Sequence, residues 1–169
     1  MINSFEGEYR VFSNFYGGED QPLDFTKCPI RINGLQYCCV EVPFHSFKTT
    51  DLEQRAAMQD WDARQAKAWG SELPRAGLVR SDWMDINLTV MERLLHIKFR
   101  AGSHLADILM NTGGKLLIEG NWWHDNFWGS CQKYCPRCVN KPRLNHLGRL
   151  LMKIRTDLQG GADNARQEA

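Results

Sequence analysis

Glu41 and Lys48 are a pair of residues whose types and spacing could carry out a reaction. Residues seven positions apart on a helix lie on one face, two turns from each other. A lysine that is partly withdrawn from water has a lowered pKa and can attack an electrophilic carbon as a neutral amine, while a nearby carboxylate moves protons. His45 lies between them on the same face and could act as an acid or a base. An ordinary surface ion pair has the same spacing, and the pattern alone does not separate the two interpretations.

Two aromatic segments have the composition of nucleotide-binding loops. Residues 12–16 (FSNFY) combine rings on which a base can stack with the polar groups of Ser13 and Asn14. Residues 121–130 (NWWHDNFWGS), here called the tryptophan loop, contain three tryptophans and Asp125. The carboxylate of Asp125 could act on water or hold a sugar hydroxyl. Core packing and turn formation are the alternative interpretations of both segments.

Cys131, Cys135 and Cys138 follow the tryptophan loop with the spacing C-x3-C-x2-C. Three thiols within eight residues suggest a zinc site, with His124 or His146 as the fourth ligand. Free cysteines in an irregular loop are the alternative. The loop is also basic, so it could instead contact phosphate groups.

Asn145 and His146 are expected to open the last helix of the chain. The free backbone amides at the start of a helix favour a phosphate or a carboxylate, although a simple asparagine N-cap would give the same pattern. Gly148 in the first turn would let a ligand or another backbone approach closely.

The elements that position these residues are one hairpin and a series of helices. Asn33-Gly34 separates two strand-like segments, residues 28–33 and 35–40, and is typical of a type I′ hairpin turn. Apolar spacing and capping residues predict a short strand at 115–119 and helices at 44–59 (with Pro43 suited to the first turn), 62–69, 81–99, 103–110 and 147–158. We therefore expect an α+β fold, predominantly helical, in one domain over residues 1–158, with residues 159–169 as a flexible tail.

Composition sets limits on the kind of protein. The chain has 169 residues, 43% of them hydrophobic, which fits one globular domain with its own core. No apolar run is long enough to span a bilayer and no signal-peptide pattern is present, so we expect a cytoplasmic protein with reduced cysteines and no membrane partner. A net charge of +1 gives no general attraction to nucleic acid. The oligomeric state stays open.

Five segments in this order match the motifs of one known family. They are FSNF at residues 12–15, VExxFxxxKT at 40–49, KF at 98–99, DxFWG at 125–129 and NxLGxLLMxIR at 145–155. Together they resemble the NADAR family, which includes the YbiA-like N-glycosidases.

The resemblance implies a compact α+β fold dominated by helices and the hydrolysis of N-ribosidic bonds. Substrates in the family include ADP-ribose attached to guanine bases and early ribosylamino-pyrimidine intermediates of riboflavin synthesis. It also implies that Lys48 attacks the anomeric carbon to form a Schiff base, with Glu41 as the acid beside it and Asp125 as the acid of the tryptophan loop. The residues expected to contact the substrate are Ser13, Asn14, Phe15, His45, Trp128, Gly129 and Asn145.

Alternatives remain in both mechanism and partner. A carboxylate could activate water instead of the lysine attacking carbon. We expect an ADP-ribose-type ligand, released from ADP-ribosylated guanine in DNA or RNA, with the riboflavin intermediates as the alternative substrates. Many relatives carry His and Gln where this chain has Val42 and His45, and Pro43 is unusual, so a module that binds ADP-ribose or NAD without turnover is also considered. No cofactor is required for the reaction; zinc could bind at Cys131, Cys135 and Cys138, and a zinc-stabilised interaction domain is a further alternative.

Overall fold

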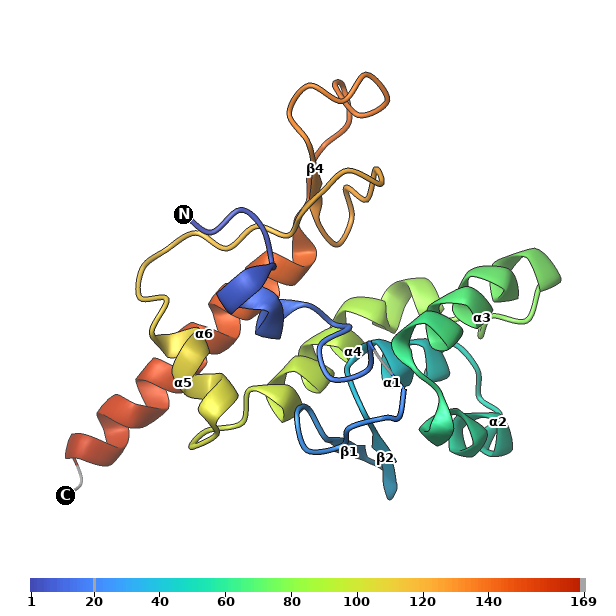
Figure 1. The fold of residues 1–169 in the computed structure, drawn as a ribbon, viewed down its shortest axis with the longest axis horizontal. Helices are drawn as coiled ribbons and strands as arrows, with labels where there is room; N and C mark the ends of the chain where they lie inside the picture. The colour runs from blue at the N-terminus through green and yellow to red at the C-terminus, as the bar shows by residue number, and fades with distance from the viewer. Residues whose placement is uncertain (20, 168–169) are drawn as a thin grey trace. The chain divides into compact units, whose positions relative to one another are not determined.

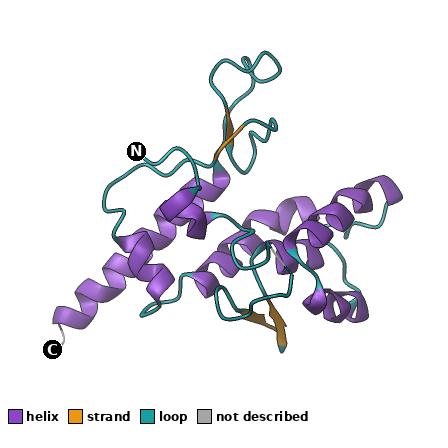
Figure 2. Cartoon of the chain, in the orientation of Figure 1, coloured by secondary structure: helices purple, strands orange, loops and turns teal. Residues whose placement is uncertain are grey.

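The computed structural model describes residues 1–19 and 21–167, and for residues 162–167 it describes the backbone alone. The chain divides into two compact units: unit 1 consists of Met1–Ser13 and Phe99–Ala169, and unit 2 of Asn14–Lys98. Helices supply most of the regular structure, with short pairs of strands beside them (Figures 1 and 2). The predicted class, α+β with a predominance of helix and a small antiparallel sheet, is confirmed.

Unit 2 contains the predicted hairpin. Strands β1 (Ile30–Ile32) and β2 (Leu35–Tyr37) pair antiparallel, with the first residue of one opposite the last residue of the other. Asn33 and Gly34 both have positive φ, 52° and 78°, as a type I′ turn requires. Local turn chemistry therefore sets the register of this sheet.

The single helix predicted at residues 44–59 is wrong, because the chain breaks it into three pieces. Helix α1 covers Glu41–Ser46, α2 covers Leu52–Ala57, and a 3-10 turn, η2, covers Met58–Asp60. The side chain of Asp51 accepts hydrogen bonds from two amides of the first turn of α2, which starts a new helix there. Lys48 therefore lies in the turn after α1 and not inside a helix.

Helix α3 (Ala63–Ala76) is longer than predicted. It begins with a capping box at Asp62 and ends at Gly77, whose φ is 66°. The predicted stop at Gly70 is wrong, because this glycine lies inside the helix. A Cβ at that position would overlap the ring of His45, so the glycine makes room for a neighbouring side chain.

Helix α4 (Trp83–Lys98) occupies the predicted range and starts two residues after Ser81. Of the apolar residues predicted at helical spacing, Met91, Leu94, Leu95 and Phe99 are buried, whereas Leu88 is exposed.

Unit 1 is built around two helices, α5 (His104–Met110) and α6 (His146–Gln167). The side chain of Ser103 caps α5, as the sequence predicted. Arg155 of α6 donates hydrogen bonds to the hydroxyl of Thr112 at 2.7 Å and to a backbone carbonyl at 2.9 Å. These bonds tie the segment that follows α5 to α6.

The strand predicted at residues 115–119 is present only as one bridge, between Ile2 and Leu117. The regular strands of unit 1 are β3 (Gly120–Asn121) and β4 (Ser130–Cys131), which pair parallel and close the tryptophan loop at its base.

The aromatic core of unit 1 gathers at the 3-10 helix η1 (Gly7–Phe12). The ring of Phe12 is fully buried and packs edge-on against Phe5, with 5.6 Å between centroids, and at 6.1 Å from Phe99. The backbone of α6 is helical over residues 159–167, where a flexible tail was predicted; residues 168–169 lie outside the described residues, and the domain limit at 158 stays a prediction.

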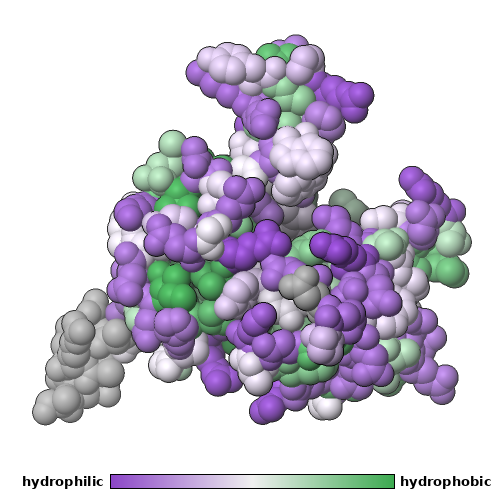
Figure 3. Space-filling model, in the orientation of Figure 1, coloured by the Kyte–Doolittle hydropathy of each residue, from purple (hydrophilic) through white to green (hydrophobic). Residues whose placement is uncertain are grey.

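On the face shown in Figure 3, hydrophilic side chains predominate and apolar side chains form separate patches. In the described part of the chain, no helix combines the length and the apolar character needed to cross a membrane.

Candidate functional site

Helix α1 brings three of the predicted site residues together in unit 2. Nε2 of His45 lies 3.1 Å from Oε1 of Glu41, one turn earlier, and both side chains are buried. The helix starts at Glu41, so Pro43 lies in its first turn as predicted and does not displace the glutamate. Lys48 follows the helix, and its Nζ donates a hydrogen bond of 2.8 Å to the carbonyl of Gly70.

The surroundings of Lys48 favour its neutral form. Burial lowers the pKa of Lys48, the positive charge of Lys67 lowers it further, and the carboxylate of Glu41 acts in the opposite direction. Trp83 and Phe44 form an aromatic wall beside the amine, with Nζ 5.9 Å from the centroid of the Trp83 ring. A half-buried amine with a lowered pKa, next to a carboxylate, is the arrangement that a lysine nucleophile requires.

Two predicted site residues of unit 2 carry buried polar atoms that have no hydrogen-bond partner among the described residues: Oδ1 of Asn14 and Nδ1 of His45. Because a carboxylate can only accept, the bond to Glu41 assigns the proton of a neutral His45 to Nε2, which leaves Nδ1 as an acceptor. Buried polar groups are normally satisfied, so the unpaired Oδ1 of Asn14 is available to a ligand or to water, whereas Nδ1 of His45 lies against Gly70.

The segment that contains Asn14 is fixed to the start of α1. The backbone carbonyl of Asn14 accepts from the amide of Glu41 at 3.1 Å, and its side chain contacts the sulfur of Met91 at 3.6 Å. The ring of Phe15 lies 5.1 Å from Nζ of Lys67. Ser13 belongs to unit 1, where its amide closes the end of η1.

In unit 1, Asp125 shapes the tryptophan loop. Its Oδ1 accepts hydrogen bonds from the amides of Phe127 and Trp128, both at 2.9 Å. The side chain of Asn121 bonds both the amide and the carbonyl of Asp125. The structure therefore gives Asp125 a positioning role within its own loop, and its predicted catalytic role stays a prediction.

Asn145 and Gly129 are also engaged in holding this loop. The side chain of Asn145 accepts from the amide of Glu119 at 3.0 Å and donates to the carbonyl of Leu117 at 2.9 Å. Gly129 packs so closely on the carbonyl of Glu119 that a Cβ would overlap it, and Gly148 packs in the same way on the carbonyl of Leu117. The close backbone approach predicted at Gly148 is confirmed.

The anion site predicted at the start of α6 is wrong. The amides of Asn145, His146 and Leu147 donate to the carbonyls of the tryptophan loop at 3.0–3.1 Å, so they are not free for a phosphate. Asn145 is not an N-cap either, because its side chain bonds residues 117 and 119, well before the helix.

The three predicted metal ligands, Cys131, Cys135 and Cys138, lie together, and the fourth residue of the cluster is His124. The four ligand atoms are all within 4.8 Å of one another. The ring of the other candidate, His146, packs against Phe127 with 4.6 Å between centroids. This cluster could hold a metal ion.

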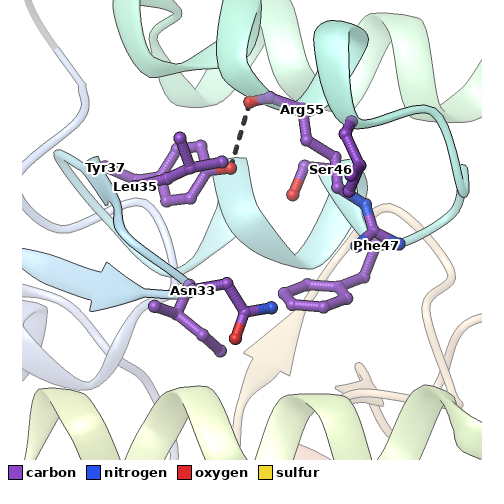
Figure 4. A pocket seen from close by; sticks show the side chains of 8 residues that line it. Asn33, Leu35, Tyr37, Ser46, Phe47 and Arg55 are labelled. Atoms are coloured by element: carbon purple, nitrogen blue, oxygen red, sulfur yellow. Dashed lines mark hydrogen bonds between the residues drawn. The ribbon is translucent and has the colours of Figure 1, made fainter.

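A hollow in unit 2 lies elsewhere, between the hairpin and helices α1 and α2 (Figure 4). Tyr37 donates a hydrogen bond of 3.0 Å to the carbonyl of Arg55 at its edge, and the guanidinium of Arg55 lies 4.7 Å from the centroid of the Phe47 ring. That guanidinium also donates to the carbonyl of Thr49. The residues that line this hollow include no predicted site residue.

Sequence reasoning missed the residues that surround Lys48, namely Lys67, Gly70 and Trp83. They belong to α3 and α4, and no spacing rule links them to α1. Their residue types, a cation, a small residue and an aromatic ring, are compatible with a site around a lysine. That could be recognised only once the fold places them next to Lys48.

A family model described as the NADAR domain matches residues 3–159. The chain belongs to the NADAR family. The resemblance drawn from the five motifs is thereby confirmed. A structural match to the NMR structure of the E. coli protein YbiA covers 96% of this chain and 89% of that one, with a TM-score of 0.73 and 25% identity.

Curated relatives carry two kinds of name. The chain is 39% identical over 83 residues to the riboflavin biosynthesis protein PYRR of Zea mays, covering 49% of this chain and 12% of that protein. It is 35% identical over 81 residues to an N-glycosidase of Nostoc punctiforme, covering 48% of this chain and 47% of that protein. It is 31% identical over 137 residues to a riboflavin biosynthesis protein of Vibrio vulnificus, covering 80% of this chain and 35% of that protein. The chain thus spans less than half the length of each of these relatives, and the family contains a member named as an N-glycosidase.

Proposed function

We propose that this NADAR protein is a hydrolase that cleaves an N-ribosidic bond and releases ADP-ribose from ADP-ribosylated guanine. The half-buried Lys48, with its lowered pKa beside the Glu41–His45 pair, is the observation that carries this proposal. Family membership and the relative named N-glycosidase support the reaction class. The substrate would reach the protein as a modified base in DNA or RNA, and we expect the reaction in the cytoplasm.

In the proposed reaction, the neutral amine of Lys48 attacks the anomeric carbon of the ribose. The bond between that carbon and the base nitrogen breaks, the base keeps the bonding electrons, and a proton from the attacking amine, now positively charged, reaches the base through the Glu41–His45 pair. The amine loses a proton, the ribose ring opens as its oxygen is protonated, and an imine to Lys48 remains. Water then hydrolyses the imine, which returns the amine and frees the sugar. The competing route, in which Glu41 activates water directly, gives the same products without an imine.

Asn14 and Phe15 would contact the substrate in unit 2, because Asn14 has an unpaired buried oxygen and Phe15 offers a ring beside the cation of Lys67. Substrate contacts by Ser13, Trp128, Gly129 and Asn145 stay predictions from the family motifs. No cofactor takes part in the proposed chemistry. Zinc at the cysteine cluster would act as a structural ion.

Hydrolysis of ribosylamino-pyrimidine intermediates of riboflavin synthesis is the second candidate. The relatives named as riboflavin biosynthesis proteins favour it. It uses the same bond cleavage, but it predicts release of ribose 5-phosphate and no need for a polynucleotide. A module that binds ADP-ribose or NAD without turnover predicts no product from any of these compounds.

The deciding experiment offers the protein an oligonucleotide with ADP-ribosylated guanine and, separately, the pyrimidine ribosides, with and without borohydride. Released sugar is measured by liquid chromatography and the protein by mass spectrometry. We expect ADP-ribose release and a covalent adduct in the wild type, both absent in Lys48→Ala and both retained in the control Lys153→Ala on α6. Turnover without an adduct would support water activation. Turnover of the pyrimidine ribosides alone would show that they, and not ADP-ribosylated guanine, are the substrate. If no product forms from any of these compounds, the result would support a module that binds ADP-ribose or NAD without turnover.

A further inference from the structure

We propose that His124, Cys131, Cys135 and Cys138 form a structural zinc site that fastens the tryptophan loop to the cysteine loop (residues 131–144). This site is separate from the Lys48 chemistry, and its occupancy can be measured without any substrate.

The spacing of the ligand atoms fits a tetrahedral ion. Nδ1 of His124 lies 3.2 Å from the sulfur of Cys135, 3.7 Å from that of Cys131 and 3.8 Å from that of Cys138. With metal bonds of about 2.3 Å to sulfur and 2.0 Å to nitrogen, the edges of a zinc tetrahedron between nitrogen and sulfur are about 3.6 Å. The three distances from Nδ1 to sulfur therefore lie within a few tenths of an ångström of this edge, and all four ligand atoms are within 4.8 Å of one another.

The backbone presents these ligands in two ways. His124 has a φ of 72°, in the left-handed region that a histidine adopts only where its surroundings demand it, and this turns its ring toward the sulfurs. Tight turns bring the cysteines together, since the amide of Cys138 donates to the carbonyl of Cys135 at 3.0 Å. Cys131 and Cys138 are buried, and no disulfide joins any of the three.

The donor set selects zinc and a structural role. Three thiolates and one imidazole suit zinc, whereas magnesium and calcium prefer oxygen ligands. Four protein ligands fill a tetrahedral ion and leave no open position for water or substrate. The ion would then support the fold of unit 1 and take no part in bond cleavage.

The cysteine loop has few other means of support. In its described residues it forms no helix and, apart from Cys131, no strand, and the side chains of Tyr134 and Val139 are 84% and 59% exposed. It appears as the long excursion beyond β4 in Figure 1. Arg143 donates to three of its carbonyls at 3.0–3.3 Å. A long loop without secondary structure gains order from such cross-links, and a metal ion would join all four side chains of the cluster at once.

The ion would also connect two loops with different tasks. His124 precedes Asp125, whose carboxylate organises the tryptophan loop, while the three sulfurs come from the cysteine loop. Hydrogen bonds already join the two loops: the amide of Cys131 donates to the side chain of Asn126 at 2.9 Å, and the amide of Leu144 donates to the carbonyl of Asn126 at 2.8 Å. Zinc would lock this junction.

One contact changes when the metal binds. Nη1 of Arg137 lies 3.5 Å from Nε2 of His124. Once Nδ1 coordinates zinc, Nε2 carries the proton and cannot accept, so the exposed Arg137 side chain turns toward solvent. Arg137→Ala should therefore keep the metal, which makes it a matched control from the same loop.

The test measures metal content and coordination in the whole protein. Wild-type protein purified with zinc, and again with cobalt in its place, is analysed by elemental mass spectrometry and visible absorption. We expect one zinc per chain, and with cobalt the absorption of a tetrahedral ion with thiolate ligands. His124→Ala and Cys135→Ser, which replace the two less buried ligands, should lose zinc to a chelator far more readily than the wild type. Arg137→Ala and His146→Ala should behave as the wild type.

Three results would overturn the zinc site: no stoichiometric metal with no thiolate–cobalt absorption, an iron–sulfur spectrum in place of zinc, or loss of metal in His146→Ala but not in His124→Ala. Fastening of the loops is read from proteolysis and from tryptophan fluorescence, since three tryptophans lie in the tryptophan loop. Removal of zinc should speed cleavage within residues 131–144 and shift the emission. If zinc binds and neither changes, the fastening role is wrong.

Discussion

Glu41 and His45 are joined by a buried hydrogen bond of 3.1 Å one turn apart on α1, and Lys48 follows at the end of the same helix. Glu41 and His45 belong to helix α1, whereas Lys48 lies in the turn that follows it. A proton can therefore be held at a fixed place while the amine keeps some freedom to reach a carbon atom.

Glu41→Gln should separate the charge of Glu41 from its shape. The glutamine oxygen can still accept from His45, but the carboxylate that raises the pKa of Lys48 is gone. We expect the pKa of Lys48 to fall further, so the midpoint of the rate–pH profile moves to lower pH. The maximal rate should drop by about 10²-fold or more, because the carboxylate that relays the proton to the leaving base is lost. Steady-state kinetics across pH measures both effects, with the exposed Glu53→Gln as control. An unchanged maximal rate would show that Glu41 moves no proton.

Lys67→Gln should shift the profile in the other direction. The cation of Lys67 lowers the pKa of Lys48, so its removal raises that pKa toward the ordinary value. Because the neutral amine is the nucleophile, the rate near neutral pH should fall while the rate at high pH is retained. Lys67 is exposed, so high salt should weaken this effect in the wild type. Lys153→Gln on α6 should leave the profile unchanged. A profile that does not move in Lys67→Gln would mean that the titrating group is not Lys48.

Gly70→Ala should destabilise the protein although alanine favours helices. The added Cβ would overlap the His45 ring, and such overpacking costs about 1–3 kcal/mol, against roughly 1 kcal/mol gained in helix propensity. Urea unfolding measures the difference. Gly160→Ala, where a Cβ meets nothing within 4 Å, is the matched control and should be neutral or stabilising. In a His45→Ala background, Gly70→Ala should lose its destabilising effect, and an unchanged cost there would argue against the contact.

Local chemistry explains which parts of the fold could be predicted. Asn33-Gly34 and Ser103 specify a turn and a cap through their own backbone and neighbours, and both lie where expected. The sequence did not predict the break at Asp51. Apolar residues occur on both sides of it, and one aspartate is a weak signal that a new helix begins there. Gly70 was mistaken for a stop, because its role is to make room for a ring from another helix.

The candidate site shows the same division. The contact between Glu41 and His45 follows from helical spacing, whereas Lys48 lies in the turn after α1, where the carboxylate of Glu41 still acts on its pKa. The fourth residue of the cysteine cluster could not be chosen between His124 and His146, because the choice depends on a left-handed backbone angle. Asn145 was expected to cap a helix, but its side chain bonds residues far earlier in the chain, which no local pattern encodes.

Two substitutions at Asp125 should distinguish its positioning role from the predicted catalytic one. In Asp125→Asn the amide oxygen can still accept from the amides of Phe127 and Trp128, so loop structure and tryptophan fluorescence should stay as in the wild type. In Asp125→Ala both bonds are lost, and the free energy of unfolding should fall by about 1–3 kcal/mol. If the carboxylate also takes part in catalysis, Asp125→Asn loses activity at full stability, because it keeps the shape and removes the charge. If Asp125 only shapes the loop, Asp125→Asn keeps its activity and Asp125→Ala alone loses it. Kinetics and urea unfolding of the same two preparations distinguish the two roles. Only a catalytic role predicts that Asp125→Asn loses activity while its free energy of unfolding is unchanged.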